Sequence, residues 1–190
     1  MLNKRYLGQL KKEILSYAEK RRETIKSCGD ALYSSKKAIF AMHKDRMEDA
    51  DDYLKKAETI FVELNKKFKK DPQIFEEGSY RAALEEFVEA SIFCQFLNNK
   101  IIGEIPNLNV DADVYIGGIC DVPGEMLRYA IKSATNRNFE MVKKCEQAAE
   151  EIIGELIDMD LTGYSRQKFD QAKQALQKLE QVAYETSLRV

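Results

Sequence analysis

Residues 25–42, IKSCGDALYSSKKAIFAM, are the stretch that decides the fold class. Apolar or small side chains recur there in alternating steps of three and four, at Ile25, Cys28, Leu32, Ser35, Ile39 and Met42. This spacing places them on one side of an α-helix. The same spacing starts at Leu7 and is interrupted once, by Arg21. We therefore predict a first helix of roughly forty residues.

Helical spacing continues along the rest of the chain, separated by short polar breaks. The predicted helices cover residues 47–68, 79–102, 115–134, 140–159 and 165–187, the last with Ser165 as its N-cap. The segment GEIPNLNVDAD at 103–113 has no period and is predicted to be the main loop. Sustained period-two alternation is missing, so no sheet is expected. The prediction is an all-α antiparallel bundle of six to seven helices, forming a single domain over 1–190.

The composition favours a globular chain and excludes several classes. Hydrophobic residues make up 44% and charged residues 33%, with three Pro and nine Gly, which argues against disorder. No apolar run is long enough for a membrane span, and the first residues lack a signal-peptide core, so we expect a soluble, cytoplasmic protein without a membrane partner. Four widely separated cysteines without a CxxC pair are expected to be buried, reduced thiols.

The net charge of −2 combines two opposed parts of the chain. Residues 1–44 carry 11 Lys or Arg against four acids, a balance of +7, and residues 45–190 carry 19 against 28, a balance of −9. A basic first helix is suited to a phosphate backbone, and it is equally the pattern of a solvated helix face. Charge alone leaves both interpretations open.

Carboxylates are the groups left to carry chemistry, because the chain has a single histidine. One imidazole excludes three-His zinc sites and HExxH proteases. A di-iron bundle requires Glu-x-x-His on two helices, but His43 follows Phe40 at that spacing. The 32 acidic residues can bind Mg²⁺ or Mn²⁺ where several are brought together.

Two pairs of acids have helical spacing. Glu86 and Glu89 are three residues apart, and Asp121 and Glu125 are four apart. Each pair leaves one side of its helix, so the pairs can converge on a divalent cation if the two helices face each other. Arg128 continues the second stripe and is placed either to hold a phosphate or to pair with Glu125. Three glycines near the second pair predict the close approach of another backbone or a ligand; they are Gly117, Gly118 and Gly124.

Four blocks of the sequence match a known pattern when taken together. The stretches YIGGICDVPGEMLRY at 115–129 and EEFVEA at 85–90 resemble the YLLG-x-x-DLTGELMR and QEYVEA blocks of the translin and translin-associated factor X superfamily. The basic segment at 21–44 and the ending from Gly163, with Lys178, Glu180, Tyr184, Ser187 and Arg189, resemble further family blocks in the same order. The resemblance covers nearly the whole chain.

The resemblance implies a translin-like helical protomer that assembles into a closed octamer holding RNA. In its catalytic, factor X-like branch four acids form a Mg²⁺-dependent endoribonuclease centre, and position by position these are Glu86, Glu89, Asp121 and Glu125. The implied substrate is single-stranded RNA, with binding of short duplexes or single-stranded DNA. A shorter internal segment and the lack of a basic targeting cluster indicate a prokaryotic-type member that assembles with itself. The candidate phosphate-binding residues are Arg21, Arg22, Lys36, Lys37 and Arg128.

Two departures from the family pattern leave alternatives open. Pro123 replaces a threonine, so the helix either kinks there or begins at Asp121, which would then be an N-cap and not a metal ligand. Gly29 replaces an arginine, which removes one RNA contact. The alternative functions are a non-catalytic scaffold that binds RNA or single-stranded DNA, and a helical protein-interaction module.

Overall fold

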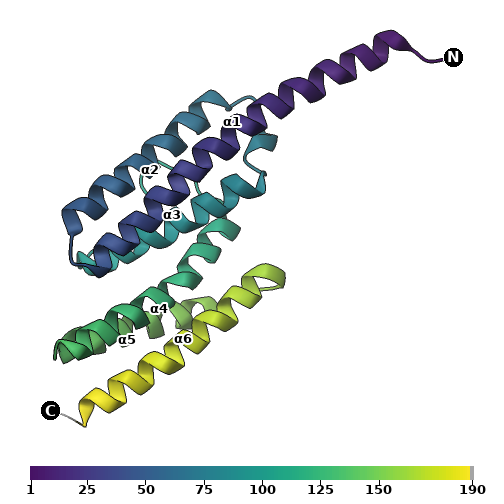
Figure 1. Cartoon of the computed structure of the whole chain (residues 1–190). Helices are drawn as coiled ribbons and strands as arrows, with labels where there is room; N and C mark the ends of the chain where they lie inside the picture. Colours follow the sequence, from purple (N-terminus) through teal and green to yellow (C-terminus); the bar gives the residue numbers. More distant parts are fainter. Residues whose placement is uncertain (189–190) are drawn as a thin grey trace.

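The computed structural model describes residues 1–188. Within that range all regular secondary structure is helical, and the longest connection is the loop at 98–111 (Figure 1). The elements are α1 (Lys4–His43), α2 (Met47–Lys67), the short 3-10 helix η1 (Pro72–Ile74), α3 (Gly78–Leu97), α4 (Ala112–Thr135), α5 (Phe139–Ile157) and α6 (Gly163–Ser187). No strand occurs in these residues, so the predicted all-α fold of six to seven helices is confirmed. Arg189, the last position of the C-terminal block, lies outside the described residues.

Two predicted helix boundaries are wrong. The third helix ends at Leu97 and not near residue 102, because Asn99 takes a left-handed conformation with φ 55°, which stops the helix. The last helix begins at Gly163 with Thr162 as its N-cap, so Ser165 lies inside the helix and does not cap it.

The helices form two groups of three that share one continuous core (Figure 1). Helices α1, α2 and α3 pack on one another, and α4 packs on both α5 and α6. The groups meet where α3 packs against α4. Within the first group, the ring of Phe61 lies 5.6 Å from that of Phe87 and 5.7 Å from that of Tyr80. The junction between α3 and α4 is therefore where residues from the two halves of the chain come together.

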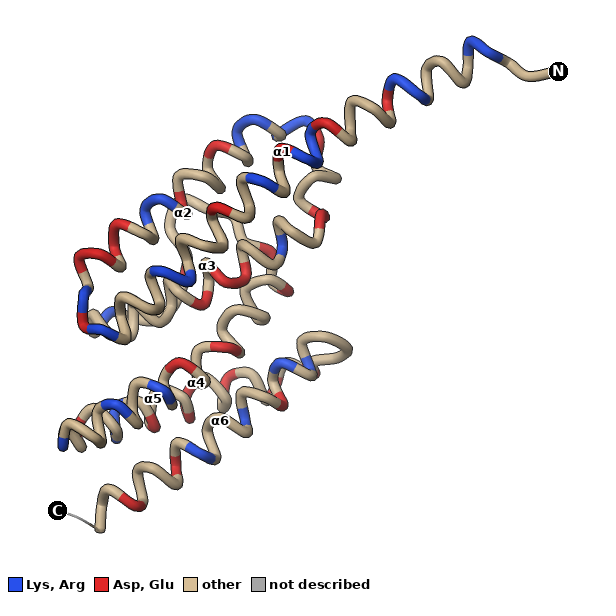
Figure 2. Tube along the Cα trace, in the orientation of Figure 1, with Lys and Arg blue, Asp and Glu red and all other residues tan. Residues whose placement is uncertain are grey.

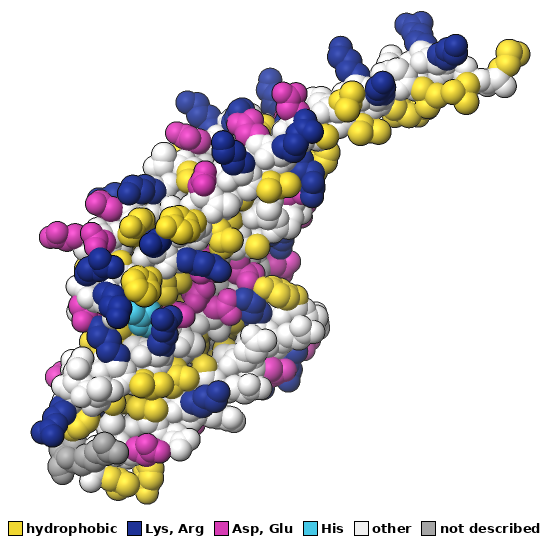
Figure 3. All heavy atoms as spheres, in the orientation of Figure 1, with side chains coloured by type: hydrophobic (Ala, Val, Ile, Leu, Met, Phe, Trp, Pro, Cys, Tyr) yellow, Lys and Arg dark blue, Asp and Glu magenta, His cyan; other side chains and the backbone are white. Residues whose placement is uncertain are grey.

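The first part of α1 projects beyond both groups (Figure 1). The first buried residue of α1 is Thr24, and the nearest anchors are the Tyr17 hydroxyl, which donates to Glu77 at 2.5 Å, and Lys20, which pairs with Asp71 at 2.5 Å. We call residues 4–16 the overhang. Hydrophobic side chains follow one side of it and Lys and Arg the other (Figure 3).

Helix α4 runs without interruption through Pro123, which is buried. The alternative in which the helix begins at Asp121 is therefore excluded, and Asp121 is not an N-cap. All four cysteines are buried and unpaired, as predicted. Among the described residues no helix combines the length and apolarity that a bilayer crossing requires.

Candidate functional site

Both predicted acidic pairs lie at the junction of the two helix groups, on α3 and α4 (Figure 2). The approach of the helices depends on glycine: a Cβ added to Gly118 would lie 2.7 Å from Cγ1 of Val88 and 2.8 Å from the carbonyl oxygen of Glu85. A Cβ on Gly117 would collide with the Glu85 carboxylate. The predicted close approach of another backbone is confirmed at Gly118, and at Gly117 the neighbour is a side chain. At Gly124 nothing among the described residues lies within 4 Å of an added Cβ, so only the approach of a ligand stays a prediction there.

Glu89 is the most buried of the four acids, with 8% of its surface exposed. No group among the described residues hydrogen-bonds to its carboxylate. Burial raises the pKa of Glu89 to about 9, and the neighbouring charges of Asp121, Glu86 and Glu125 add to the rise. The four carboxylates therefore influence one another's charge, while their convergence on a cation stays a prediction.

Glu86 and Asp121 are also shifted towards the neutral form. Burial raises the pKa of Glu86, Lys36 opposes the rise from 3.8 Å, and Asp121 and Glu125 add to it. Burial likewise raises the pKa of Asp121, against a hydrogen bond from Lys168. Like charges brought together in a partly buried place are relieved either by proton uptake or by a nearby cation.

Lys168, on α6, is the strongest local cation of the site. Its ammonium lies 2.7 Å from the Glu85 carboxylate and donates a second hydrogen bond to Asp121. Burial lowers the pKa of Lys168, but these two carboxylates outweigh that effect and raise it above its usual range. The Tyr164 hydroxyl also donates to Glu85, at 2.7 Å. Helix α6 is thereby tied to both α3 and α4 across the site.

Glu125 has two neighbours that can hold its carboxylate in place. The ring of His43, at the end of α1, hydrogen-bonds to Glu125 and packs 5.3 Å from the ring of Phe93. Arg128 lies 3.6 Å from the same carboxylate, so in this structure it pairs with Glu125. Of the other candidate cations, Lys36 reaches the site, whereas Arg21 pairs with Glu77 at 2.8 Å near the overhang.

Sequence reasoning missed Lys168, His43 and Glu85. Lys168 is 47 residues from Asp121, and His43 is 82 residues from Glu125, so only the packing of α6 and α1 reveals these contacts. Glu85 was visible as a third acid beside Glu86, but it lies outside the i, i+3 pair. Its contact with Gly117 on α4 shows only in the packed structure.

The donor set suits a hard divalent cation. Carboxylate oxygens are the ligands that Mg²⁺ and Mn²⁺ prefer, and Glu89 is a buried carboxylate without a partner. Within residues 1–188, however, no three His, Cys, Asp or Glu side chains are placed as a preformed metal cage. The reason is local: Asp121 is turned to Lys168 and Glu125 to His43.

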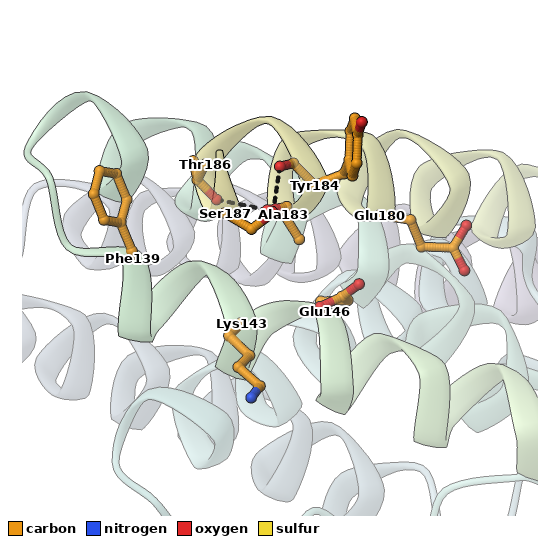
Figure 4. A pocket seen from close by; sticks show the side chains of 8 residues that line it. All are labelled: Phe139, Lys143, Glu146, Glu180, Ala183, Tyr184, Thr186 and Ser187. Atoms are coloured by element: carbon orange, nitrogen blue, oxygen red, sulfur yellow. Dashed lines mark hydrogen bonds between the residues drawn. The ribbon is translucent and has the colours of Figure 1, made fainter. Parts of the chain in front are cut away.

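A separate groove of about 410 Å³ lies between the start of α5 and the end of α6 (Figure 4). Phe139, Glu146, Glu180 and Tyr184 contribute to its lining. Burial and the charges of Glu150 and Glu180 raise the pKa of Glu146. Tyr184 is sixteen helical residues from Lys168, roughly 24 Å along α6, so this groove is distinct from the acidic cluster.

Comparison with known proteins gives one family and several solved structures. The family model described as Translin family matches residues 19–190. The crystal structure of apo-NeC3PO is similar, with a TM-score of 0.86, 27% identity and coverage of 98% of both chains. AfC3PO gives a TM-score of 0.89 at 23% identity, over 97% of this chain and 98% of that one. The AfC3PO–duplex RNA complex gives 0.85 at 23% identity over 97% of each. No match is found among curated proteins.

Proposed function

This chain belongs to the translin family, and from that premise we propose that it is a divalent-metal-dependent endoribonuclease of the factor X-like branch. The proposed substrate is single-stranded RNA, and the proposed metal is Mg²⁺, with Mn²⁺ able to replace it. One observation carries the proposal. Four carboxylates from two packed helices act on one another's charge, and burial raises the pKa of three of them; the four are Glu86, Glu89, Asp121 and Glu125. A bound cation would stabilise their ionised forms.

The four carboxylates would hold the metal, which when bound polarises a phosphodiester and lowers the pKa of a water molecule. The chain's own residues do the positioning. Lys168 fixes Asp121, and His43 fixes Glu125, so each carboxylate is oriented by a group on another helix. Lys36 and Arg128 lie at the edge of the cluster, where they can neutralise the phosphate of a bound strand.

We further propose that the protein is a cytoplasmic, prokaryotic-type member that assembles with itself into a closed octamer around RNA. The overhang supports self-assembly, because its apolar stripe has no partner among residues 1–188: Ile14 is 65% exposed and Leu15 57%. The structure of a complex of AfC3PO with duplex RNA supports RNA as the ligand of this chain too. Short duplexes and single-stranded DNA are the proposed secondary ligands.

A non-catalytic RNA-binding scaffold is the second candidate. The observation that favours it is the placement of the acids, because no three ligands within residues 1–188 form a preformed cage. In that case Lys168 and His43 are permanent partners of Asp121 and Glu125 and serve only to hold the helix groups together.

Incubation of the protein with end-labelled single-stranded RNA, in Mg²⁺ and in EDTA, separates the two candidates. A nuclease cleaves the RNA in Mg²⁺ and leaves it intact in EDTA. A scaffold binds the RNA without cleaving it in either solution. Glu125→Ala should abolish cleavage and leave RNA retention largely intact, while Glu63→Ala, an exposed acid on α2, serves as the control. Cleavage by Glu125→Ala at the wild-type rate would remove Glu125 from the site.

A further inference from the structure

One side of α1, continued by its C-cap Lys44, carries basic and aromatic side chains that are exposed or half-exposed. The same side holds one exposed acid, Asp30, between Lys26 and Tyr33; the basic and aromatic residues are Arg22, Lys26, Tyr33, Lys36, Lys37, Phe40 and Lys44. We call this the basic–aromatic stripe. Figure 3 shows Lys and Arg beside hydrophobic side chains on the face of the molecule around the single histidine.

The two aromatic rings of the stripe are open to solvent. Tyr33 is 61% exposed and Phe40 is 47% exposed. They are seven residues apart, which is about two helical turns or roughly 10.5 Å along the axis. A lysine lies over each ring: the ammonium of Lys37 is 5.4 Å from the Tyr33 centroid, and that of Lys44 is 5.7 Å from the Phe40 centroid. Each ring thus has a lysine ammonium over one face and is otherwise open to solvent.

One edge of the stripe borders the acidic cluster. Lys36 lies 3.8 Å from Glu86, and His43, two helical turns further along α1, contacts Glu125. A strand lying on the stripe therefore passes beside the carboxylates.

We infer that Tyr33 and Phe40 are base-stacking residues that hold unpaired RNA across the acidic site. The inference rests on the proposed function for the identity of the ligand and adds how the ligand is selected. Lysines alone attract any polyanion. Exposed rings between them can also stack on the bases of a single strand, whereas the bases of a duplex are already stacked and paired inside the helix. When a base stacks on Tyr33 or Phe40, the lysine over that ring is free to meet the adjoining phosphate.

The composition of the stripe favours RNA over a protein partner. Five of its seven members are Lys or Arg, and four of these are lysines. Lysine is depleted from the centre of protein–protein interfaces, while positive grooves with interspersed aromatic rings are typical of single-strand binding.

The test is binding in EDTA, so that no cleavage intervenes, with three fluorescent probes: a single-stranded RNA, an abasic strand of the same length and a blunt RNA duplex. Tyr33→Leu and Phe40→Leu should each weaken binding of the single strand at least about fivefold. Affinity for the abasic strand and the slope of affinity against salt should not change, because no charge is lost. Lys37→Gln should weaken binding of all three probes and flatten the slope. Tyr184→Leu, an equally exposed tyrosine on α6, should bind like wild type.

Three results would overturn the inference. The first is wild-type affinity of Tyr33→Leu and Phe40→Leu for the single strand, or an equal loss on the abasic strand. The second is a changed subunit number by light scattering with unchanged RNA affinity, which would make the stripe a protein interface. The third is a wild-type protein that binds none of the probes. If RNA binding depends on the two rings and on the lysine charge as described, but the wild type never cleaves RNA in Mg²⁺, the inference stands and only the nuclease proposal fails.

Discussion

Replacement of Glu89 by glutamine should stabilise the metal-free protein and abolish its metal response. Glu89 is 8% exposed, has no hydrogen-bonding partner among the described residues and has a pKa raised to about 9. At neutral pH the unfolded chain carries this group ionised, whereas the folded chain must take up a proton. Glutamine has nearly the same shape and no charge, so Glu89→Gln avoids that cost.

The sign and size follow from linkage. A carboxylate whose pKa is raised on folding contributes its full stability below its ordinary value of 4.5 and loses it as pH rises towards 9. Each pH unit in that window costs about 1.4 kcal/mol. At pH 7 the metal-free wild type is therefore less stable than Glu89→Gln by about 3 kcal/mol, which for a chain of this size is roughly 6–12 °C in Tm.

Thermal unfolding in EDTA from pH 4.5 to pH 8 measures this difference. The Tm of Glu89→Gln should equal that of wild type at the acid end and exceed it increasingly towards pH 8. Addition of Mg²⁺ should raise the Tm of wild type only. Glu63→Gln, an exposed carboxylate on α2, should follow the wild-type curve. A constant difference between Glu89→Gln and wild type across the pH range would refute the assigned burial and clustering of Glu89.

Two further predictions concern packing and assembly. Gly118→Ala should lower Tm by several degrees, because its Cβ would lie 2.7 Å from Val88 and 2.8 Å from the Glu85 carbonyl oxygen. Gly124→Ala has open space around its Cβ, so it should be stabilised by about 1 kcal/mol through helix propensity. Equal melting of the two variants would contradict the α3–α4 contact. Ile14→Asp should reduce the subunit number measured by light scattering, because it puts a charge into the apolar stripe of the overhang; an assembly of unchanged size would leave that stripe without a role in self-association.

Sequence periodicity was sufficient for the all-α fold, and helical spacing was sufficient to place each pair of acids on one side of its helix. Both depend on local geometry: a side chain's direction on a helix is fixed by its position along the chain. Helix ends were less predictable, because the left-handed Asn99 that ends α3 leaves no mark in an apolar pattern. The course of α4 through Pro123 could not be decided from sequence, since both a continuous and an interrupted helix satisfy the same spacing.

The partners of the acids were beyond sequence for a different reason. Asp121 and Glu125 are both on α4, but the cation of the first comes from α6 and the hydrogen-bonding partner of the second from α1. The first contact depends on the packing of α6 on α4, and the second on the junction of the two helix groups. Neither can therefore be predicted from local sequence. A cluster of carboxylates costs stability wherever it is buried, and here groups from two other helices offset part of that cost. Glu89 is the member left without such a partner, so its ionised form is the one that a bound cation would stabilise most.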